Sequence, residues 1–258
     1  MLLALDIGNT NITGAIFDGD EMMATFRMTT KVPRTSDEFG MMITNLIEKN
    51  KIKPHAITDI IVASVVPKIN YSLGSALIKY FNITPITVEP GIKTGIRLDA
   101  YNPRQVGSDR IVDAVAAYTL YGGPVIVVDF GTATTYDLVT EEGSFTGGVT
   151  APGAQSAASS LWNLTAQLPE VQIVKPTTVI AKDTVSSMQA GIYYSQIGQT
   201  EAIIRELKRE SGKNDIKVVA TGGLGGLITE GTDIIDIYDP ALTMKGLKII
   251  FDKQPRRQ

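Results

Sequence analysis

The sequence predicts an α/β protein with two similar lobes, and the main reason is a motif that occurs twice. An apolar run ends in Asp6 and is followed by Gly8; about halfway along the chain a second apolar run ends in Asp129 and is followed by Gly131. Small hydroxyl or amide side chains follow the glycine in both copies. Two such strand-turn-strand motifs in 258 residues indicate a duplicated fold with one phosphate-binding turn in each half. We expect such a chain to bind a nucleotide between its lobes.

The first half is expected to alternate strands and helices after an opening meander. Apolar runs too short for helices predict strands, and apolar residues that recur with helical period predict helices. Thr35 and Glu38 have the spacing of a capping box, and Pro67 stops the strand before the second helix. In chain order the expected elements are strands over 1–8 and 12–17, a third strand after Asp18-Gly19, a helix over 36–49, a strand over 60–66, a helix over 71–81 and a strand over 83–88.

The second half is expected to repeat the meander after a helix that ends at Gly122-Gly123. In chain order the expected elements are a helix over 109–120, strands over 125–129 and 135–140, a strand after Glu142-Gly143, helices over 154–166 and 184–210, a strand over 216–221 and a helix over 243–251. The boundary between the lobes is predicted to divide the chain into 1–121 and 122–258, with a hinge near the two glycines. Among the helix positions expected to face the core are Leu73, Leu77, Ile78, Phe81, Val112, Val115, Ala116 and Thr119.

Composition and charge exclude several classes of function. The net charge of -3 and the scattered basic residues offer no stripe for a nucleic-acid backbone, so no nucleic-acid partner is expected. Apolar runs shorter than a membrane span and an N-terminus without a basic leader predict a cytoplasmic protein without a membrane partner. The absence of cysteine and the single His55 exclude thiol nucleophiles, thiolate zinc sites and histidine triads. Chemistry must therefore come from carboxylates, basic side chains, hydroxyls and backbone amides.

The repeated turns are the first candidate site. Backbone amides and small hydroxyls in such a turn can hold phosphate oxygens, while Asp6 or Asp129 can position a cation or its water shell. The alternative for either aspartate is a polar residue that simply ends a strand. Matched context in two copies favours the phosphate-binding interpretation.

Two glycine-containing segments are further candidates. Gly222-Gly223 follows a buried strand and can let an adenine ring lie against bare backbone, although an ordinary tight turn explains the pair equally well. Gly107-Ser108-Asp109-Arg110 opens a helix, so its amides favour an anion, Arg110 can bind oxygens in a bidentate manner and Asp109 can accept a proton. Without that context, Ser108 or Asp109 is simply a helix cap.

These four elements together resemble the type III pantothenate kinase family, which belongs to the superfamily of actin, sugar kinases and Hsp70. The resemblance spans essentially the whole chain and includes the order and spacing of the motifs quoted above and of Gly147-Gly148 and Pro152-Gly153. It implies two duplicated ribonuclease H-like lobes with mixed sheets flanked by helices and ATP in the cleft between them. It also implies transfer of the ATP γ-phosphoryl group to pantothenate, the first step toward coenzyme A, by an obligate homodimer.

The resemblance assigns roles to individual residues. Asp109 is implied as the proton acceptor, Asp129 as a ligand of a potassium or ammonium ion, and Thr132 as an ATP contact. Residues implied to bind pantothenate are Gly107, Ser108, Asp109, Arg110 and Thr184. Residues expected to bind ATP through the first turn are Asp6, Ile7, Gly8, Asn9, Thr10, Asn11, Ile12 and Thr13, and Gly222 and Gly223 are the candidate adenosine contacts. Phosphoryl transfer needs alignment and charge neutralisation more than a strong base, which Mg²⁺ bound with ATP and a monovalent cation can supply.

Three positions depart from the family pattern, and two other functions compete. An aromatic residue expected at position 100 is alanine here, with Tyr101 one residue later; Asp113 replaces asparagine and Ala181 replaces glycine. Asp113 is expected to share a helix face with Asp109 and raise its proton affinity, or else to point into solvent or pair with another basic group. The alternative functions are a non-catalytic nucleotide-binding regulatory accessory protein and another small-molecule kinase. Intact Asp6, Asp109 and Asp129 argue against the former.

Overall fold

The computed structural model describes residues 1–89, 91–99 and 102–255, and these form two compact units. Of the described residues, unit 1 contains 1–89, 91–95, 102–116 and 243–255, and unit 2 contains 96–99 and 117–242. Within this described part of the chain, no helix has the length and apolar character needed to cross a membrane.

Unit 1 is built on a five-stranded sheet with the order β3-β2-β1-β4-β5. The first three strands form the antiparallel meander predicted from the sequence, and β4 and β5 extend the sheet in parallel with β1. Because β1 is central, the turn at its carboxyl end lies next to the end of β4. The strands are β1 (Leu2–Ile7), β2 (Asn11–Asp18), β3 (Glu21–Thr29), β4 (Asp59–Ser64) and β5 (Ile86–Thr87).

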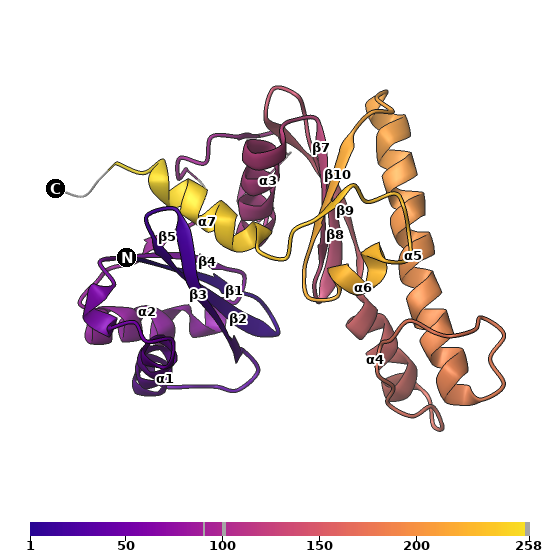
Figure 1. Ribbon diagram of the computed structural model, residues 1–258, viewed down its shortest axis with the longest axis horizontal. Coiled ribbons are helices and arrows are strands. Elements are labelled where there is room, and N and C mark those ends of the chain that lie inside the picture. Colours follow the sequence, from indigo (N-terminus) through magenta and orange to yellow (C-terminus); the bar gives the residue numbers. More distant parts are fainter. Residues whose placement is uncertain (90, 100–101, 256–258) are drawn as a thin grey trace. The chain divides into compact units, whose positions relative to one another are not determined.

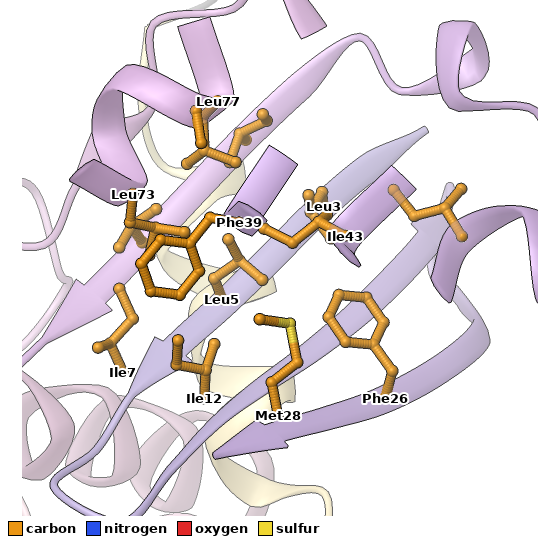
Figure 2. Packing of buried hydrophobic residues seen from close by; sticks show 14 of the residues in the cluster. Leu3, Leu5, Ile7, Ile12, Phe26, Met28, Phe39, Ile43, Leu73 and Leu77 are labelled. Atoms are coloured by element: carbon orange, nitrogen blue, oxygen red, sulfur yellow. The ribbon is translucent and has the colours of Figure 1, made fainter. Parts of the chain in front are cut away.

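Two helices cover one face of this sheet, α1 (Ser36–Lys49) and α2 (Pro67–Phe81) (Figure 1). The capping box is present: the Thr35 hydroxyl accepts from the Glu38 amide, and the Glu38 carboxylate accepts from the Thr35 amide at 2.7 Å. Figure 2 shows the apolar core between the helices and the sheet, where each fully buried side chain stabilises the fold by about 1.5–3 kcal/mol. Its labelled members are Leu3, Leu5, Ile7, Ile12, Phe26, Met28, Phe39, Ile43, Leu73 and Leu77.

The C-terminal helix α7 (Leu242–Asp252) packs closely on the first part of α3 (Ser108–Tyr121). A Cβ atom at Gly246 would lie 2.3 Å from the carbonyl oxygen of Val112, so only glycine lets the two backbones approach this closely. On the same helix, Lys248 pairs with Asp20, at the turn between β2 and β3. The last helix therefore completes the unit that the first strands begin.

Unit 2 is built on a six-stranded sheet with the order β11-β10-β7-β8-β9-β6. Apart from the added edge strand β6, this order and the strand directions repeat those of unit 1, which confirms the predicted duplication. The strands are β6 (Arg97–Leu98), β7 (Val125–Phe130), β8 (Ala133–Val139), β9 (Ser144–Pro152), β10 (Lys217–Thr221) and β11 (Ile237–Tyr238).

The long helix α5 (Thr184–Ser211) runs along this second sheet, with α4 (Ala154–Leu164) and the short α6 (Gly225–Thr229) beside it (Figure 1). Tyr136 of β8 and Tyr193 of α5 are almost fully buried between the sheet and the helices. The Tyr136 hydroxyl lies 3.0 Å from the Thr200 hydroxyl, which satisfies both polar groups inside an apolar core.

Several details of the sequence prediction are corrected by the structure. α2 begins at Pro67 rather than at residue 71. Proline is well suited to the first helical position, because a backbone N–H there would have no hydrogen-bond partner within the helix. Ile78 is 49% exposed, and Thr119 is also exposed, so neither faces the core. Strand β5 is only two residues long, and β6, β11, α6 and the 3-10 turns at Pro54–Ala56 and Pro103–Gln105 were not predicted.

The two units are not the same segments as the predicted lobes 1–121 and 122–258. The chain passes from unit 1 to unit 2 within α3, between Ala116 and Ala117, and returns before Thr243. The physical reason is the close packing of α7 on α3 described above. The predicted hinge at Gly122-Gly123 stays a prediction.

Candidate active site

The first turn joins β1 to β2 and contains the residues predicted to hold ATP. The Gly8 amide donates to Asn11 O at 3.0 Å, which closes the turn. Thr30, after β3, supports it from the side: its amide donates to Thr10 O at 3.0 Å and its hydroxyl to Gly8 O at 2.8 Å. Asn9 at the tip is exposed. Hydrogen bonds from Thr30 thus fix the backbone of the turn, while its tip is accessible to a ligand.

The start of α3 lies at the same sheet edge as the first turn. The Val65 amide donates to Ile7 O at 3.1 Å, and the Ser108 hydroxyl donates to Ser64 O at 3.1 Å. Ser64 in turn donates its hydroxyl to Asn70 Oδ1 at 2.6 Å and accepts from the Val66 amide. These contacts tie the helix that carries Asp109 to the ends of β1 and β4.

Asp109 folds back over the first turn of its own helix. Its Oδ1 atom accepts from the Arg110 amide at 2.8 Å. A Cβ atom at Gly107 would lie 2.4 Å from that same oxygen, so glycine is required there for this position of the carboxyl group. Burial raises the pKa of the Asp109 carboxyl, whereas the hydrogen bond from the Arg110 amide and the Arg110 charge act in the opposite direction. A carboxyl group with a raised pKa suits a proton acceptor.

Asp113 is buried, with 3% of its surface exposed, so the prediction that it points into solvent is wrong. Burial raises the pKa of Asp109, and the Arg110 amide, the Arg110 charge and the amide of Asp109 itself lower it, so the direction of the shift is explained without Asp113. The predicted effect of Asp113 on the proton affinity of Asp109 therefore has no support in the structure.

The second turn joins β7 to β8 and is one residue shorter than the first between equivalent strand pairs. The start of α4 lies directly against it: the Gly153 amide donates to Thr132 O at 3.2 Å and the Ser156 hydroxyl to the same oxygen at 2.6 Å. A Cβ atom at Gly153 would lie 2.3 Å from Gly131 O, so glycine is needed for this close approach.

Gly222 lies beside Asp129, because Thr221 pairs with Asp129 across the parallel strands β10 and β7. Its φ angle of +94° belongs to the region that favours glycine, and a Cβ atom there would lie 2.5 Å from Asp129 Oδ1. Nothing lies within 4 Å of a Cβ atom built on Gly223. The Gly-Gly pair therefore combines a tightly packed residue with an open one.

Thr184 is the first residue of α5, in unit 2, after the cap Asp183. The Asp183 carboxylate accepts from the Ser186 amide at 2.9 Å and from the Ser186 hydroxyl at 2.6 Å, and these bonds lower its pKa, the hydroxyl bond most. Thr184 is exposed and lines an open cavity of about 610 Å³ together with Lys182, Ser187 and apolar side chains of α4 and α5.

The described residues contain no group of three or more His, Asp or Glu side chains that could hold a metal ion by themselves. A single carboxylate at each turn, Asp6 at the first and Asp129 at the second, fits a cation that arrives with the phosphates of a nucleotide, since Mg²⁺ commonly takes one or two protein carboxylates and completes its shell with phosphate and water.

The structure brings the predicted site residues together in two groups. The first turn and Gly107, Ser108, Asp109 and Arg110 belong to unit 1, whereas Asp129, Thr132, Thr184, Gly222 and Gly223 belong to unit 2. Ala100 and Tyr101 lie outside the described residues. Sequence reasoning missed the supporting residues Thr30, Ser64 and Ser156, because each acts on a segment far away in the chain and no local motif marks it.

Comparison with known proteins agrees with the motifs. Residues 2–206 match the family described as type III pantothenate kinase. A type III pantothenate kinase from Agathobacter rectalis is 59% identical over 257 residues, which cover 100% of this chain and 99% of that protein. Proteins of the same name from Listeria welshimeri and Bifidobacterium longum are 48% and 45% identical, over 97% and 98% of this chain and 96% and 99% of their own.

Solved structures with lower identity support the fold alone. A Sinorhizobium meliloti protein assigned as a 2-dehydro-3-deoxygalactonokinase has a TM-score of 0.63 at 12% identity, covering 100% of this chain and 98% of its own. A Campylobacter jejuni protein assigned to the Baf family of transcriptional activators has a TM-score of 0.61 at 22% identity, covering 97% and 98%. Both agree with the duplicated α/β architecture.

Proposed function

This chain belongs to the type III pantothenate kinase family, and from that premise we propose which of its residues carry out the reaction. The enzyme phosphorylates pantothenate in coenzyme A biosynthesis and uses ATP with a divalent cation. Neither the regulatory alternative nor another small-molecule kinase is favoured by any of the similar sequences reported above.

Asp109 is the proposed proton acceptor. It takes the proton of the pantothenate hydroxyl while the hydroxyl oxygen bonds to the γ-phosphorus of ATP and the bond to the β-phosphate oxygen breaks, which releases ADP. The observation that carries this assignment is its placement at the helix start tied to the first turn, with a raised pKa. Arg110 supplies a positive charge and Gly107 the space for the carboxyl group.

The two turns are the proposed nucleotide contacts, and the divalent ion is proposed to be Mg²⁺. Residues 6–13 hold phosphate oxygens through backbone amides and small polar side chains. Thr132, Gly222 and Gly223 complete the ATP contacts, with Gly223 offering the open backbone surface for adenosine. Asp129 is proposed to hold K⁺ or NH₄⁺, whose charge offsets that of the phosphates. Thr184 is the proposed pantothenate contact from unit 2.

A homodimer is the proposed assembly. It is supported by large apolar side chains around the connection from α4 to α5 that are exposed in the single chain: Leu164 (84%), Val179 (62%), Ile180 (83%), Val185 (42%) and Tyr194 (44%). Large apolar side chains that would be exposed in a single chain are candidates for a protein interface. Ile180→Glu is expected to shift the molar mass measured by light scattering from dimer to monomer, and an unchanged dimer would contradict the choice of surface.

A coupled assay tests the reaction and the cation together. ADP release is measured with and without pantothenate, and the products are then identified by mass spectrometry. Phosphopantothenate is expected only when both substrates are present. Activity is expected in potassium or ammonium buffer and to fall in sodium buffer. Equal rates in all three buffers, or an Asp129→Ala enzyme with an unaltered potassium response, would exclude the proposed cation site.

A further inference from the structure

Arg34 is a half-buried cation that forms no ion pair within the described part of the chain. It lies in the segment between β3 and α1, close in sequence to Thr30, which supports the first turn. The Glu38 carboxylate feels its charge, but that carboxylate accepts from the amide and the hydroxyl of Thr35. A half-buried guanidinium without a carboxylate partner is a suitable binding group for an anion from outside the protein.

The guanidinium group is held in a defined orientation. Its Nη1 atom donates to Thr29 O at 2.7 Å and to Val32 O at 3.3 Å, and its carbon lies 5.9 Å from the centre of the Phe39 ring. Since both of these hydrogen bonds use Nη1, the donors on Nε and Nη2 are not taken by any described residue. Those two nitrogens form the side of a guanidinium that binds phosphate in a bidentate manner.

The residue that orients Arg34 is itself attached to the first turn. Thr29 Oγ1 lies 3.5 Å from Thr10 O, and the adjacent Thr30 binds Thr10 O and Gly8 O. The guanidinium is therefore linked to the turn proposed to hold the ATP phosphates through Thr29 alone, whose carbonyl binds Arg34 and whose side chain binds Thr10 O. A cation held at this place would neutralise phosphate charge without having to reorient during the reaction.

We propose that Arg34 binds the phosphate groups of ATP at the first turn through Nε and Nη2, as a cation that adds to the turn amides. This role rests on the proposed function, because it needs the first turn to be the phosphate site. The competing role for Arg34 is purely structural, as a clamp on the 29–34 segment through the carbonyls of Thr29 and Val32.

Binding of ATP separates the two roles. Arg34→Gln removes the charge, and its dissociation constant for Mg·ATP, measured by calorimetry without pantothenate, is expected to rise on the order of 10- to 100-fold. Arg34→Lys keeps the charge but cannot bind in a bidentate manner, so a smaller rise is expected. Arg209→Gln is the matched control, because Arg209 is exposed on α5 in unit 2 and pairs only with Glu206; its dissociation constant should equal that of the parent enzyme.

Two results would overturn the proposal. One is an Arg34→Gln protein that is folded by circular dichroism and binds Mg·ATP as the parent does. The other is a change confined to the pantothenate KM. If Arg34→Gln does not fold, Arg34→Lys decides, since equal affinity for Mg·ATP in that variant also overturns the proposal.

Failure of this inference can be told apart from failure of the proposed function. A parent enzyme that forms no phosphopantothenate refutes the proposed function whatever Arg34 does. A parent enzyme that is active and binds Mg·ATP, with Arg34 variants that bind it equally well, refutes the role of Arg34 alone.

Discussion

The two Asp-x-Gly turns follow strands of nearly the same kind but have different surroundings. β1 and β7 share one burial pattern, with four buried residues, a half-buried aspartate and a buried last residue. The first turn is bordered by Ser64 and by the helix start that carries Asp109; the second is bordered by Gly222 and by the glycine-led start of α4. Besides the aspartate that both turns share, the first turn thus has the Asp109 carboxyl group beside it, whereas the second has the glycines Gly153 and Gly222 packed against it. We propose a division of roles in which both turns bind the nucleotide and only the surroundings of the first turn add a proton acceptor.

The largest effect is expected from Asp109→Asn, which removes the carboxyl group of α3 that lies beside the first turn. Loss of a general base costs about 10²- to 10⁴-fold in kcat/KM, while the dissociation constant for Mg·ATP should stay near that of the parent. In the parent, activity should fall as pH drops through the raised pKa of Asp109, because a proposed proton acceptor must be deprotonated to act. A variant with near-parental kcat/KM would break the proposed division.

The same substitution should not lower the stability of the protein at neutral pH. The pKa of Asp109 is higher in the folded protein than in the unfolded chain, so folding favours its protonated form. The stability that this group contributes is present below its unfolded pKa and is lost as pH rises through its folded pKa. Asparagine is never ionised, so the midpoint of thermal unfolding of Asp109→Asn at pH 7 is expected to equal or exceed that of the parent. A lower midpoint would mean that the ionised carboxylate stabilises the fold.

The second turn is tested by a pair of glycine substitutions. Gly222→Ala places a methyl group against Asp129 and on a backbone with positive φ, which should destabilise the protein by about 3 kcal/mol and weaken ATP binding. Gly223→Ala meets no atom within 4 Å, so chemical denaturation should show little change. If adenosine lies on Gly223, the second variant still loses ATP affinity. Unchanged affinity would identify the pair as an ordinary turn.

A smaller effect is expected from Ser108→Ala. The Ser108 hydroxyl donates to Ser64 O, and Ser108 is 9% exposed. Loss of this hydrogen bond, which is worth about 1 kcal/mol, should hold Asp109 less firmly in place. We expect kcat to fall roughly fivefold with the pantothenate KM unchanged. Steady-state kinetics at saturating ATP separate the two constants. A rise confined to the pantothenate KM would instead identify the hydroxyl as a substrate contact.

The smallest effect is expected from Asp113→Asn. Because burial and Arg110 account for the pKa shift of Asp109, the acid limb of the pH profile of kcat/KM should superimpose on that of the parent. A limb displaced to lower pH would restore the coupling between the two carboxylates that their helical spacing suggested.

Local signals predicted most of the fold, and long-range contacts explain what they missed. The capping box of Thr35 and Glu38 predicted the start of α1 because all its contacts lie within one turn of the helix. Two-residue strands such as β6 and β11 have no periodicity to read and exist only through pairing with β9 and β10. In the candidate site, the motifs identified Asp109 and both turns. The roles of Ser64 and Arg34 could not be predicted from the sequence, because they depend on partners that only the folded structure brings to them.

The packing of α7 on α3 bears on how the protein is made. Synthesis proceeds from the N-terminus, and domains generally fold as units while the chain emerges. Unit 1 needs residues 243–255, so it remains incomplete while the whole of unit 2 is translated. Gly246 can meet the backbone of Val112 only after the last helix has left the ribosome, and the helix that bears Asp109 is packed from that moment. Packing of the helix that carries Asp109, the proposed proton acceptor, is therefore completed only after the whole of unit 2 has been synthesised.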